Sequence, residues 1–408
     1  MKRKVLAAIV IAMGLMVTGC GEDVPTDSPL QTLPPQTVSD EPSDTLDPST
    51  PEEPSGEEEG GETDATGRKP GGETHTIGQR SEVNGQVQSR LTGEWKDAEV
   101  ANRRSLALMI PNNKAAMPQY GISYASIIYE APVEGAITRI MGIFEDYDEL
   151  DRIGPARSSR DYYVYEAMAY GSIYCNWGLA VPYVAPIINT DRIDNVSQPL
   201  LGIEQGGASE AYDRVSRPGY SKEYTGYLFI DGYKKAVDRL GYDKTYADYG
   251  KFDQAFTFAD EGYVATYDSY PDATKVYPGG TQSNSGGYGN ANPCFEYNPE
   301  DGLYYRSQYG SAQIDEYNGE QLAVSNVVFK ICHGEARDAN GYLAFELHGK
   351  GDAYVFTNGK VIKGTWEHRD DYDNNTFRDE NGNEIVFNQG KTWICCIWKE
   401  YADKISYE

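Results

Sequence analysis

A long stretch near the start of the chain, residues 21–70, contains no Phe, Trp or Tyr. It is dense in Asp and Glu and rich in Pro, Ser, Thr and Gly. Such a segment cannot bury enough apolar surface to offset the conformational entropy that folding costs, and its like charges extend it. We therefore predict a disordered acidic tether over 20–93 and a folded part over 94–408. An acidic recognition tail is the alternative interpretation of the same residues.

The residues before the tether have the pattern of a bacterial lipoprotein signal. Three basic residues, Lys2, Arg3 and Lys4, precede the apolar run 5–17, which is too short to span a bilayer as a mature helix. Small residues then precede Cys20, as a lipoprotein signal peptidase requires. We predict a signal peptide over 1–19 and acylation of Cys20, with palmitate as an expected acyl group. An ordinary signal peptide with a chance cysteine is the alternative.

The lipoprotein signal and the net charge limit the partners that we expect. Two acyl chains anchor a protein stably, so the folded part is predicted to be held at the cell membrane on its extracytoplasmic side. The net charge of −27, much of it in the tether, argues against nucleic acid and anionic lipid headgroups. The partners that remain are the membrane through Cys20, and an envelope polymer, a small anion or a membrane protein.

The folded part is long enough for two domains. We predict an α+β protein, with a mixed α/β domain over 94–250 and a mostly-β domain over 251–408. Apolar, β-branched and aromatic runs predict strands, and flanking caps and breaks predict helices. Two Asn-Gly pairs, at Asn358 and Asn381, predict hairpins. The main predicted strands are 105–110, 125–129, 137–144, 172–177, 353–357, 360–366, 384–388 and 391–398, and the predicted helices are 161–170 and 227–240.

Charged residues gather around the strand pair of the first domain. Burying a charged group at the edge of a sheet costs free energy unless the group is paired. We therefore expect these charged side chains to converge on one site. Guanidinium groups beside the first turn of a helix suit a carboxylate or a phosphate. Internal salt bridging, without any ligand, is the alternative. The predicted binding residues are Asn112, Glu134, Thr138, Arg139, Arg157, Ser158 and Arg160.

Catalysis has less support than binding. Glu130 and Glu134 are the alternative catalytic residues, as the acid and base of a hydrolase acting on envelope glycan or peptide. They would have no such role if they pair with nearby arginines. The first domain contains no histidine, which excludes Ser-His or Cys-His catalysis there unless the second domain supplies one. The histidines of the chain are His75, His333, His348 and His368.

Metal and cofactor sites are not predicted. The cysteine spacing does not match zinc ligation, and buried thiols are expected, with a disulfide from Cys332 to Cys395 or Cys396 as the alternative. The acidic runs 370–375 and 379–384 lack the glycine and distal glutamate of a calcium loop, so we interpret them as turns. Besides Cys20, the cysteines are Cys175, Cys294, Cys332, Cys395 and Cys396.

Several motifs together resemble one family. They are an Asn-bearing turn at Asn112, YE…EGxITR over 129–139, IGPxRSxR over 153–160, LYYR over 303–306, NGKVIKGTW over 358–366 and GNEIVFNQGKTW over 382–393. This set resembles the YerB-like lipoproteins of Gram-positive bacteria, over essentially all of residues 100–400. The resemblance implies a lipid-anchored, two-domain, extracytoplasmic protein, and it implies no activity because the function of that family is unknown.

The chain departs from the family pattern at three places where histidine is often found. Here those places read Cys-Asn-Trp-Gly over 175–178, Arg-Pro-Gly-Tyr-Ser-Lys-Glu-Tyr-Thr over 217–225, and Gln at Gln313. If the histidines serve a reaction or a metal in other members, this chain has lost it. The departures therefore favour binding over catalysis.

Overall fold

The computed structural model describes residues 69–70, 82–251, 253–279 and 287–408. The signal peptide, Cys20, His75 and most of the tether therefore lie outside the described residues. Within them, strands predominate over helices, which confirms the predicted α+β class. In the same part of the chain, no helix combines the length and the apolarity needed to cross a membrane.

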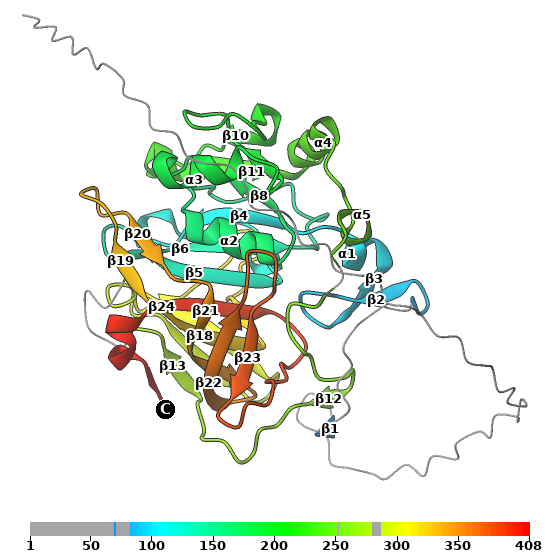
Figure 1. The fold of residues 1–408 in the computed structure, drawn as a ribbon, viewed down its shortest axis with the longest axis vertical. Helices are drawn as coiled ribbons and strands as arrows, with labels where there is room; N and C mark the ends of the chain where they lie inside the picture. The colour runs from blue at the N-terminus through cyan, green and yellow to red at the C-terminus, as the bar shows by residue number, and fades with distance from the viewer. Residues whose placement is uncertain (1–68, 71–81, 252, 280–286) are drawn as a thin grey trace, which may run out of the picture. The chain divides into compact units, whose positions relative to one another are not determined.

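One ten-stranded sheet runs through both halves of the chain (Figure 1). The strands of the first half continue into those of the second where β24 lies parallel to β5, with residues 392–395 paired to 127–130. In sheet order the strands are β23 (Thr376–Asp379), β22 (Lys360–His368), β21 (Gly349–Thr357), β18 (Asn326–Cys332), β24 (Thr392–Trp398), β5 (Ile127–Val133), β6 (Ile137–Phe144), β4 (Leu106–Pro111), β8 (Ile173–Asn176) and β9 (Asn195–Ser197).

Apolar side chains cover both faces of this sheet, because its central strands are buried over their whole length. One face packs against α2 and α3, and the other against α4 and a six-stranded sheet. The helices are α1 (Ala98–Asn102), α2 (Asp161–Ala169), α3 (Val181–Ile188), α4 (Ile230–Leu240) and α5 (Tyr246–Tyr249), with the 3-10 turns η1 (Lys114–Ala116), η2 (Ile122–Tyr124), η3 (Ser209–Ala211), η4 (Lys222–Tyr224) and η5 (Lys399–Lys404).

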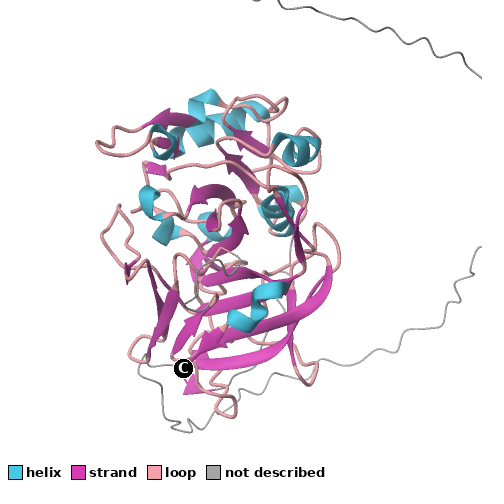
Figure 2. Cartoon of the chain, turned by 90° about the vertical axis from the view of Figure 1, so that its left-hand side faces the viewer, coloured by secondary structure: helices cyan, strands magenta, loops and turns pink. Residues whose placement is uncertain are grey.

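The remaining strands form smaller sheets. The six-stranded sheet contains β16 (Ser311–Ala312), β15 (Leu303–Gln308), β14 (Cys294–Asn298), β13 (Lys275–Tyr277) and β25 (Ser406–Tyr407), with β17 (Ala323–Val324) on β15. The others are β10 (Tyr212–Arg214) with β11 (Gly226–Phe229) and β7 (Arg152–Ile153), β2 (Gln86–Gln88) with β3 (Trp95–Asp97), β19 (Gly334–Ala336) with β20 (Leu343–Phe345), and β1 (Lys69–Pro70) with β12 (Tyr263–Val264). In side view most helices lie in the upper half of the picture and the long strands in the lower half, with one helical segment drawn across them (Figure 2).

The structure corrects three local predictions. Residues 227–229, predicted as helix, belong to β11, because this apolar run pairs with β10 and β7 before α4 begins at Ile230. The strand predicted over 125–129 runs over Ile127–Val133, because Pro132 pairs with Thr138 inside the β5–β6 ladder. Residues 384–388 form isolated bridges instead of a strand, because their backbone N–H groups bond to several separate segments: Ile385 N to Phe377 O, Val386 N to Tyr267 Oη, Phe387 N to Thr257 O and Asn388 N to Asn326 Oδ1.

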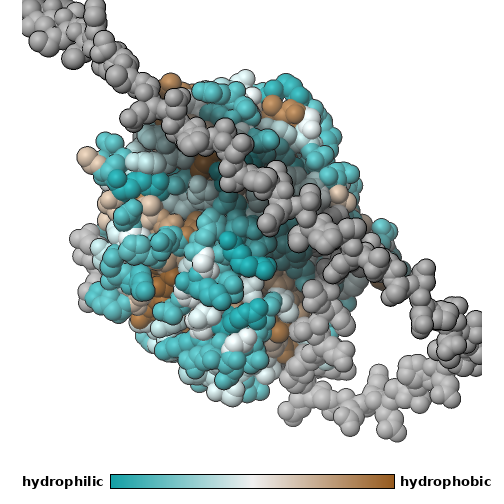
Figure 3. All heavy atoms as spheres, in the orientation of Figure 1, coloured by the Kyte–Doolittle hydropathy of each residue, from teal (hydrophilic) through white to brown (hydrophobic). Residues whose placement is uncertain are grey.

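Other predictions hold closely. β6 has the predicted bounds, and α2 begins at the predicted residue, Asp161. The first Asn-Gly pair forms the predicted hairpin between β21 and β22, with positive φ at both Asn358 and Gly359. The face seen in Figure 3 is largely hydrophilic with scattered apolar patches, as expected for a surface in contact with water.

Candidate functional site

The β5–β6 hairpin distributes the predicted site residues over two faces of the central sheet. Successive side chains of a strand point to opposite faces, so Thr138 and Arg139 diverge. The sequence predicted one cluster, whereas the structure contains two. The Glu130 network consists of Asn112, Glu130, Thr138, Arg306, Gln308, Gln313 and Trp393. The Arg139 cluster consists of Glu134, Arg139, Arg157, Ser158 and Arg160, with Glu223 at its edge.

In the Glu130 network, both oxygens of a fully buried carboxylate are satisfied. Oε1 accepts hydrogen bonds from Thr138 Oγ1 at 2.6 Å and Asn112 Nδ2 at 2.8 Å. Oε2 accepts one from Trp393 Nε1 at 2.9 Å and lies 2.9 Å from Arg306 Nη2. A buried charge is tolerated only when it is paired and hydrogen-bonded in this way.

The network closes through side chains of the second half. Arg306 Nε donates to Gln313 Oε1 at 2.8 Å, and Gln308 Nε2 donates to Asn112 Oδ1 at 2.8 Å. Gln313, which stands at one of the places where the family resemblance suggested histidine, also donates to Asn112 Oδ1, at 3.3 Å. The sequence-based site missed Arg306, Gln308 and Trp393. The alternating strand LYYRSQ, which buries Tyr304, Arg306 and Gln308, was the signal that could have found two of them.

This enclosure bears on the alternative catalytic pair. A general acid or base must reach the proton that it transfers. Glu130 is 0% exposed and engaged by four neighbours, and Glu134 is engaged by Arg160. The geometry gives no support to acid–base chemistry by these two carboxylates.

In the Arg139 cluster, two of the three arginines are paired with carboxylates. Arg160 holds Glu134 with two parallel bonds, Nε to Oε1 at 2.9 Å and Nη2 to Oε2 at 2.5 Å, the bidentate geometry that guanidinium favours. Burial alone would raise the pKa of Glu134, but the hydrogen bonds and charge of Arg160 outweigh it and lower that pKa. Arg157 Nη2 lies 3.1 Å from Glu223 Oε2.

Arg139 differs from its two neighbours. It is only 6% exposed, and its Nη1 donates to the backbone oxygen of Ser158. No carboxylate forms an ion pair with it among the residues that the structure describes. Burial, together with the positive charges of Arg160 and Arg157, lowers the pKa of Arg139 to about 10. Within the described residues, the cluster therefore contains one buried guanidinium that forms no ion pair, although the charge of Glu134 lies near enough to interact with it.

The turn after the Gly154-Pro155 break positions the outer arginines. Its backbone lies against β4, where Arg157 N donates to Met109 O at 2.8 Å, and against the end of β8, where Ser159 N donates to Gly178 O at 2.8 Å. Gly178 is required for this approach, because a Cβ there would stand 2.6 Å from Ser158 Oγ. α2 then begins directly after Arg160.

The thiols and acidic runs take no part in either group, apart from one contact. All five described cysteines are free, and Cys395 Sγ lies 3.9 Å from Glu130 Oε2. Cys395 and Cys396 point to opposite faces of β24, as strand geometry requires. The runs 370–375 and 379–384 are turns capped by Asp370 and Asp379. The described residues contain no group of His, Cys, Asp and Glu arranged to hold a metal ion.

Comparison with known proteins identifies the family. The chain belongs to the protein family of unknown function DUF3048, whose N-terminal domain matches residues 91–243 and whose C-terminal domain matches residues 285–394. This confirms the resemblance seen in the sequence motifs. The function of the family is unknown, so membership defines a two-part protein without defining an activity.

One relative and one solved structure are similar over most of the chain. The relative is YerB of Bacillus subtilis (strain 168), named as a predicted lipoprotein. It is 27% identical over 311 residues, which cover 76% of this chain and 86% of YerB. The crystal structure of YerB from Bacillus subtilis matches with a TM-score of 0.64 at 24% identity, covering 79% of this chain and 99% of that one. At this identity the structural likeness shows the fold alone.

Proposed function

We propose that this protein is a lipid-anchored binding or scaffolding protein on the extracytoplasmic side of the cell membrane. Its Arg139 cluster would recognise an anionic or polar ligand of the cell envelope, either a polymer, a small anion or an acidic segment of a membrane protein. The observation that carries the proposal is the buried guanidinium of Arg139, which has no carboxylate partner among the described residues.

The chemistry of the cluster favours an anion over other ligands. The cluster contains two carboxylates, Glu134 and Glu223, and three guanidinium groups, so it has an excess of one positive charge. A buried charge without a partner costs free energy, so an anion that approaches Arg139 relieves a cost already present in the free protein. Guanidinium groups present paired N–H donors to carboxylate or phosphate oxygens.

The anchor rests on independent support. The sequence ending in Cys20 has the pattern of a lipoprotein signal, and the related YerB is named as a predicted lipoprotein. Palmitate on Cys20 and the extracytoplasmic orientation follow from that pattern as part of the proposal. A hydrolase is not part of it, because Glu130 is enclosed and Glu134 is paired.

A melting experiment tests the binding function. The chain from residue 21 to 408 is melted with phosphate, dicarboxylates, muropeptides and anionic wall polymers, beside Arg157→Ala. A ligand that binds only the native state raises the melting temperature, increasingly so as its concentration exceeds its dissociation constant. We expect an anionic ligand to raise it in the wild type and not in Arg157→Ala.

Arg239→Ala is the matched control, since Arg239 pairs with Glu210 on the surface of α4, outside the cluster. It should respond as the wild type does. Equal responses of all three proteins to an anion would place its binding elsewhere, and the absence of a response to every ligand would contradict the proposal.

A further inference from the structure

The central sheet opens in the second half of the chain. β18 and β21 pair only as far as Lys330 and Ala353, whereas β18 stays on β24 to Cys332 and β21 stays on β22 to Gly349. Beyond Lys330 the two strands separate, and a pocket of about 370 Å³ occupies the opening. We call it the sheet-opening pocket.

Trp366 fixes this opening. Its indole Nε1 donates to Ile331 O at 2.8 Å, which uses a backbone acceptor that strand pairing would otherwise take. The ring crosses β21 at Gly351, where a Cβ would come within 2.5 Å of Nε1. On its other side the ring contacts Lys330, whose ammonium lies 4.5 Å from the ring centroid and pairs with buried Glu166 at 2.7 Å. The pocket therefore has a rigid wall.

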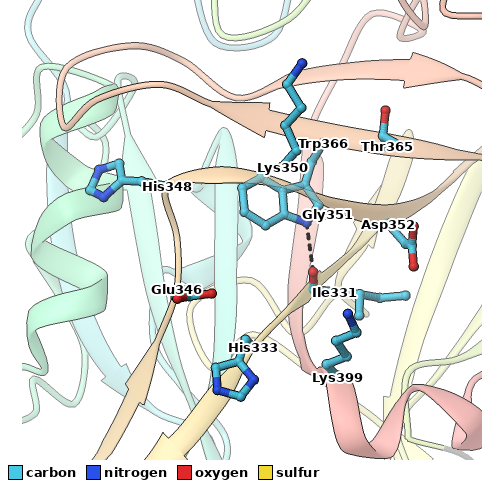
Figure 4. Close-up of a pocket in the computed structure, with 10 residues that line it drawn as sticks. All are labelled: Ile331, His333, Glu346, His348, Lys350, Gly351, Asp352, Thr365, Trp366 and Lys399. Atoms are coloured by element: carbon cyan, nitrogen blue, oxygen red, sulfur yellow. Dashed lines mark hydrogen bonds between the residues drawn. The ribbon is translucent and has the colours of Figure 1, made fainter.

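Six ionisable residues line the pocket, and four of them are His333, Glu346, Asp352 and Lys399. In Figure 4, Glu346 and Asp352 lie on opposite sides of Trp366, and His333 and Lys399 lie below it. None of the four side chains forms a hydrogen bond or an ion pair with any residue that the structure describes. By contrast, the other two ionisable residues of the lining, His348 and Lys350, pair with Asp371 and Glu367.

We infer that the sheet-opening pocket binds a small zwitterion of dipeptide size, with its ammonium held by one of the two carboxylates, Glu346 or Asp352, and its carboxylate on Lys399. Two unpartnered carboxylates and one unpartnered ammonium match the two ends of such a ligand. His333 would supply a further hydrogen bond to the carboxylate end. The edge between β18 and β21 suits a peptide group, because the two backbones do not pair with each other beyond Lys330 and Ala353, although Ile331 O is taken by Trp366.

Other ligand classes fit less well. A metal ion is disfavoured, because the His, Asp and Glu side chains around the pocket are not arranged for coordination within the described residues. A simple anion would meet two carboxylates, and a simple amine would leave Lys399 unmatched. This site shares no residue with the Arg139 cluster and does not depend on its proposed function.

Calorimetric titration of the chain from residue 21 to 408 tests the inference. The ligands are alanylalanine, its N-acetyl form, which lacks the ammonium, and its C-terminal amide, which lacks the carboxylate. We expect saturable binding of the free dipeptide and about tenfold weaker binding of each capped form, because each loses a charge-assisted hydrogen bond.

Pocket variants test which residues bind the ammonium end of the dipeptide and which bind its carboxylate end. The double variant Glu346→Gln with Asp352→Asn should no longer distinguish the free dipeptide from the acetylated one, and Lys399→Gln should no longer distinguish it from the amide. All three side chains are exposed, so these variants should fold. Glu335→Gln and Lys404→Gln, on β19 and η5 but outside the pocket, are the matched controls and should retain both preferences.

Two results would overturn the inference. One is the absence of saturable binding of alanylalanine up to about 10 mM, which corresponds to an affinity too weak for a built site. The other is binding that neither cap weakens or that the pocket variants leave unchanged.

Discussion

Arg306 and Glu130 form a fully buried ion pair that joins the two halves of the chain, with Nη2 of Arg306 2.9 Å from Oε2 of Glu130. Arg306 comes from β15 and Glu130 from β5, and Trp393 of β24 contacts both, with its Nε1 on Glu130 and its ring beneath the guanidinium. Truncating either partner leaves a desolvated charge behind. The ion pair therefore couples the stability of the two halves, because neither half can unfold without leaving a buried charge unpaired in the other.

Arg306→Ala should lower the free energy of unfolding by about 3 to 5 kcal/mol, the usual cost of leaving one buried charge unpaired. Adding Glu130→Gln should recover part of this loss, since the remaining group is then neutral. Urea unfolding of residues 21–408 measures both. Lys350→Ala, which breaks the exposed pair with Glu367, is the control and should change stability by less than about 1 kcal/mol. A similarly small effect of Arg306→Ala would refute this account of the pair.

The same reasoning applies to Lys330 and Glu166, which join β18 to α2 at 2.7 Å with both side chains fully buried. Lys330→Met alone should be strongly destabilising, because the Glu166 carboxylate stays fully buried with Asn375 as its remaining hydrogen-bond donor among the described side chains. Lys330→Met combined with Glu166→Gln should be much milder. Chemical unfolding of the four proteins of this double-mutant cycle gives the coupling energy, and additive effects would show that the two side chains do not depend on each other.

Glu134 should contribute a pH-dependent part of the stability. Its pKa in the folded protein lies below the ordinary value of 4.5, so its stabilising effect is present above pH 4.5 and is lost as the pH falls through the lower folded pKa. Glu134→Gln should be less stable than the wild type at pH 7, and the difference should shrink on acidification. Unfolding midpoints from pH 7 to pH 3 check this, and a constant difference over that range would contradict it.

The thiols should differ sharply in reactivity. Burial raises the pKa of Cys175, Cys395 and Cys396, and a thiol rather than a thiolate is a poor nucleophile. Burial raises the pKa of Cys294 as well, but Cys294 is only partly buried, so a thiol reagent should reach and label it first in the native chain of residues 21–408. Cys294→Ser should remove the fast phase. Rapid labelling of several cysteines without denaturant would show that the core is more open than described.

Local signals in the sequence predicted much of the fold. The apolar run of β6, the Gly154-Pro155 break before α2 and the Asn-Gly turn between β21 and β22 all depend on near neighbours in the chain. The predicted helix over 227–240 was partly wrong, because its first residues form β11, which pairs with β10 and β7. Tertiary pairing there overrides the local pattern.

The sites were harder to predict because they depend on long-range pairing. Glu130 meets Arg306 across 176 positions, and Trp393, which the parallel pairing of β24 with β5 brings beside Glu130, contacts both side chains. The alternation along β6 does separate Thr138 from Arg139, but only the structure shows what each face contacts. The sheet-opening pocket depends on where the β18–β21 ladder stops, which neither strand encodes alone.

The central claim is that Arg139 is a buried cation awaiting an anion, and one comparison tests it most directly. Inorganic phosphate is titrated into residues 21–408 and into Arg139→Met at constant ionic strength, with chloride as the reference anion. Binding is followed by calorimetry and the melting temperature is measured in parallel.

We predict saturable phosphate binding by the wild type and none by Arg139→Met. Without phosphate, the variant should melt no lower than the wild type, because it loses an unpaired buried charge. A variant that binds phosphate as the wild type does, or that melts far lower in its absence, would contradict the claim. Arg139 would then serve the fold through its bond to Ser158.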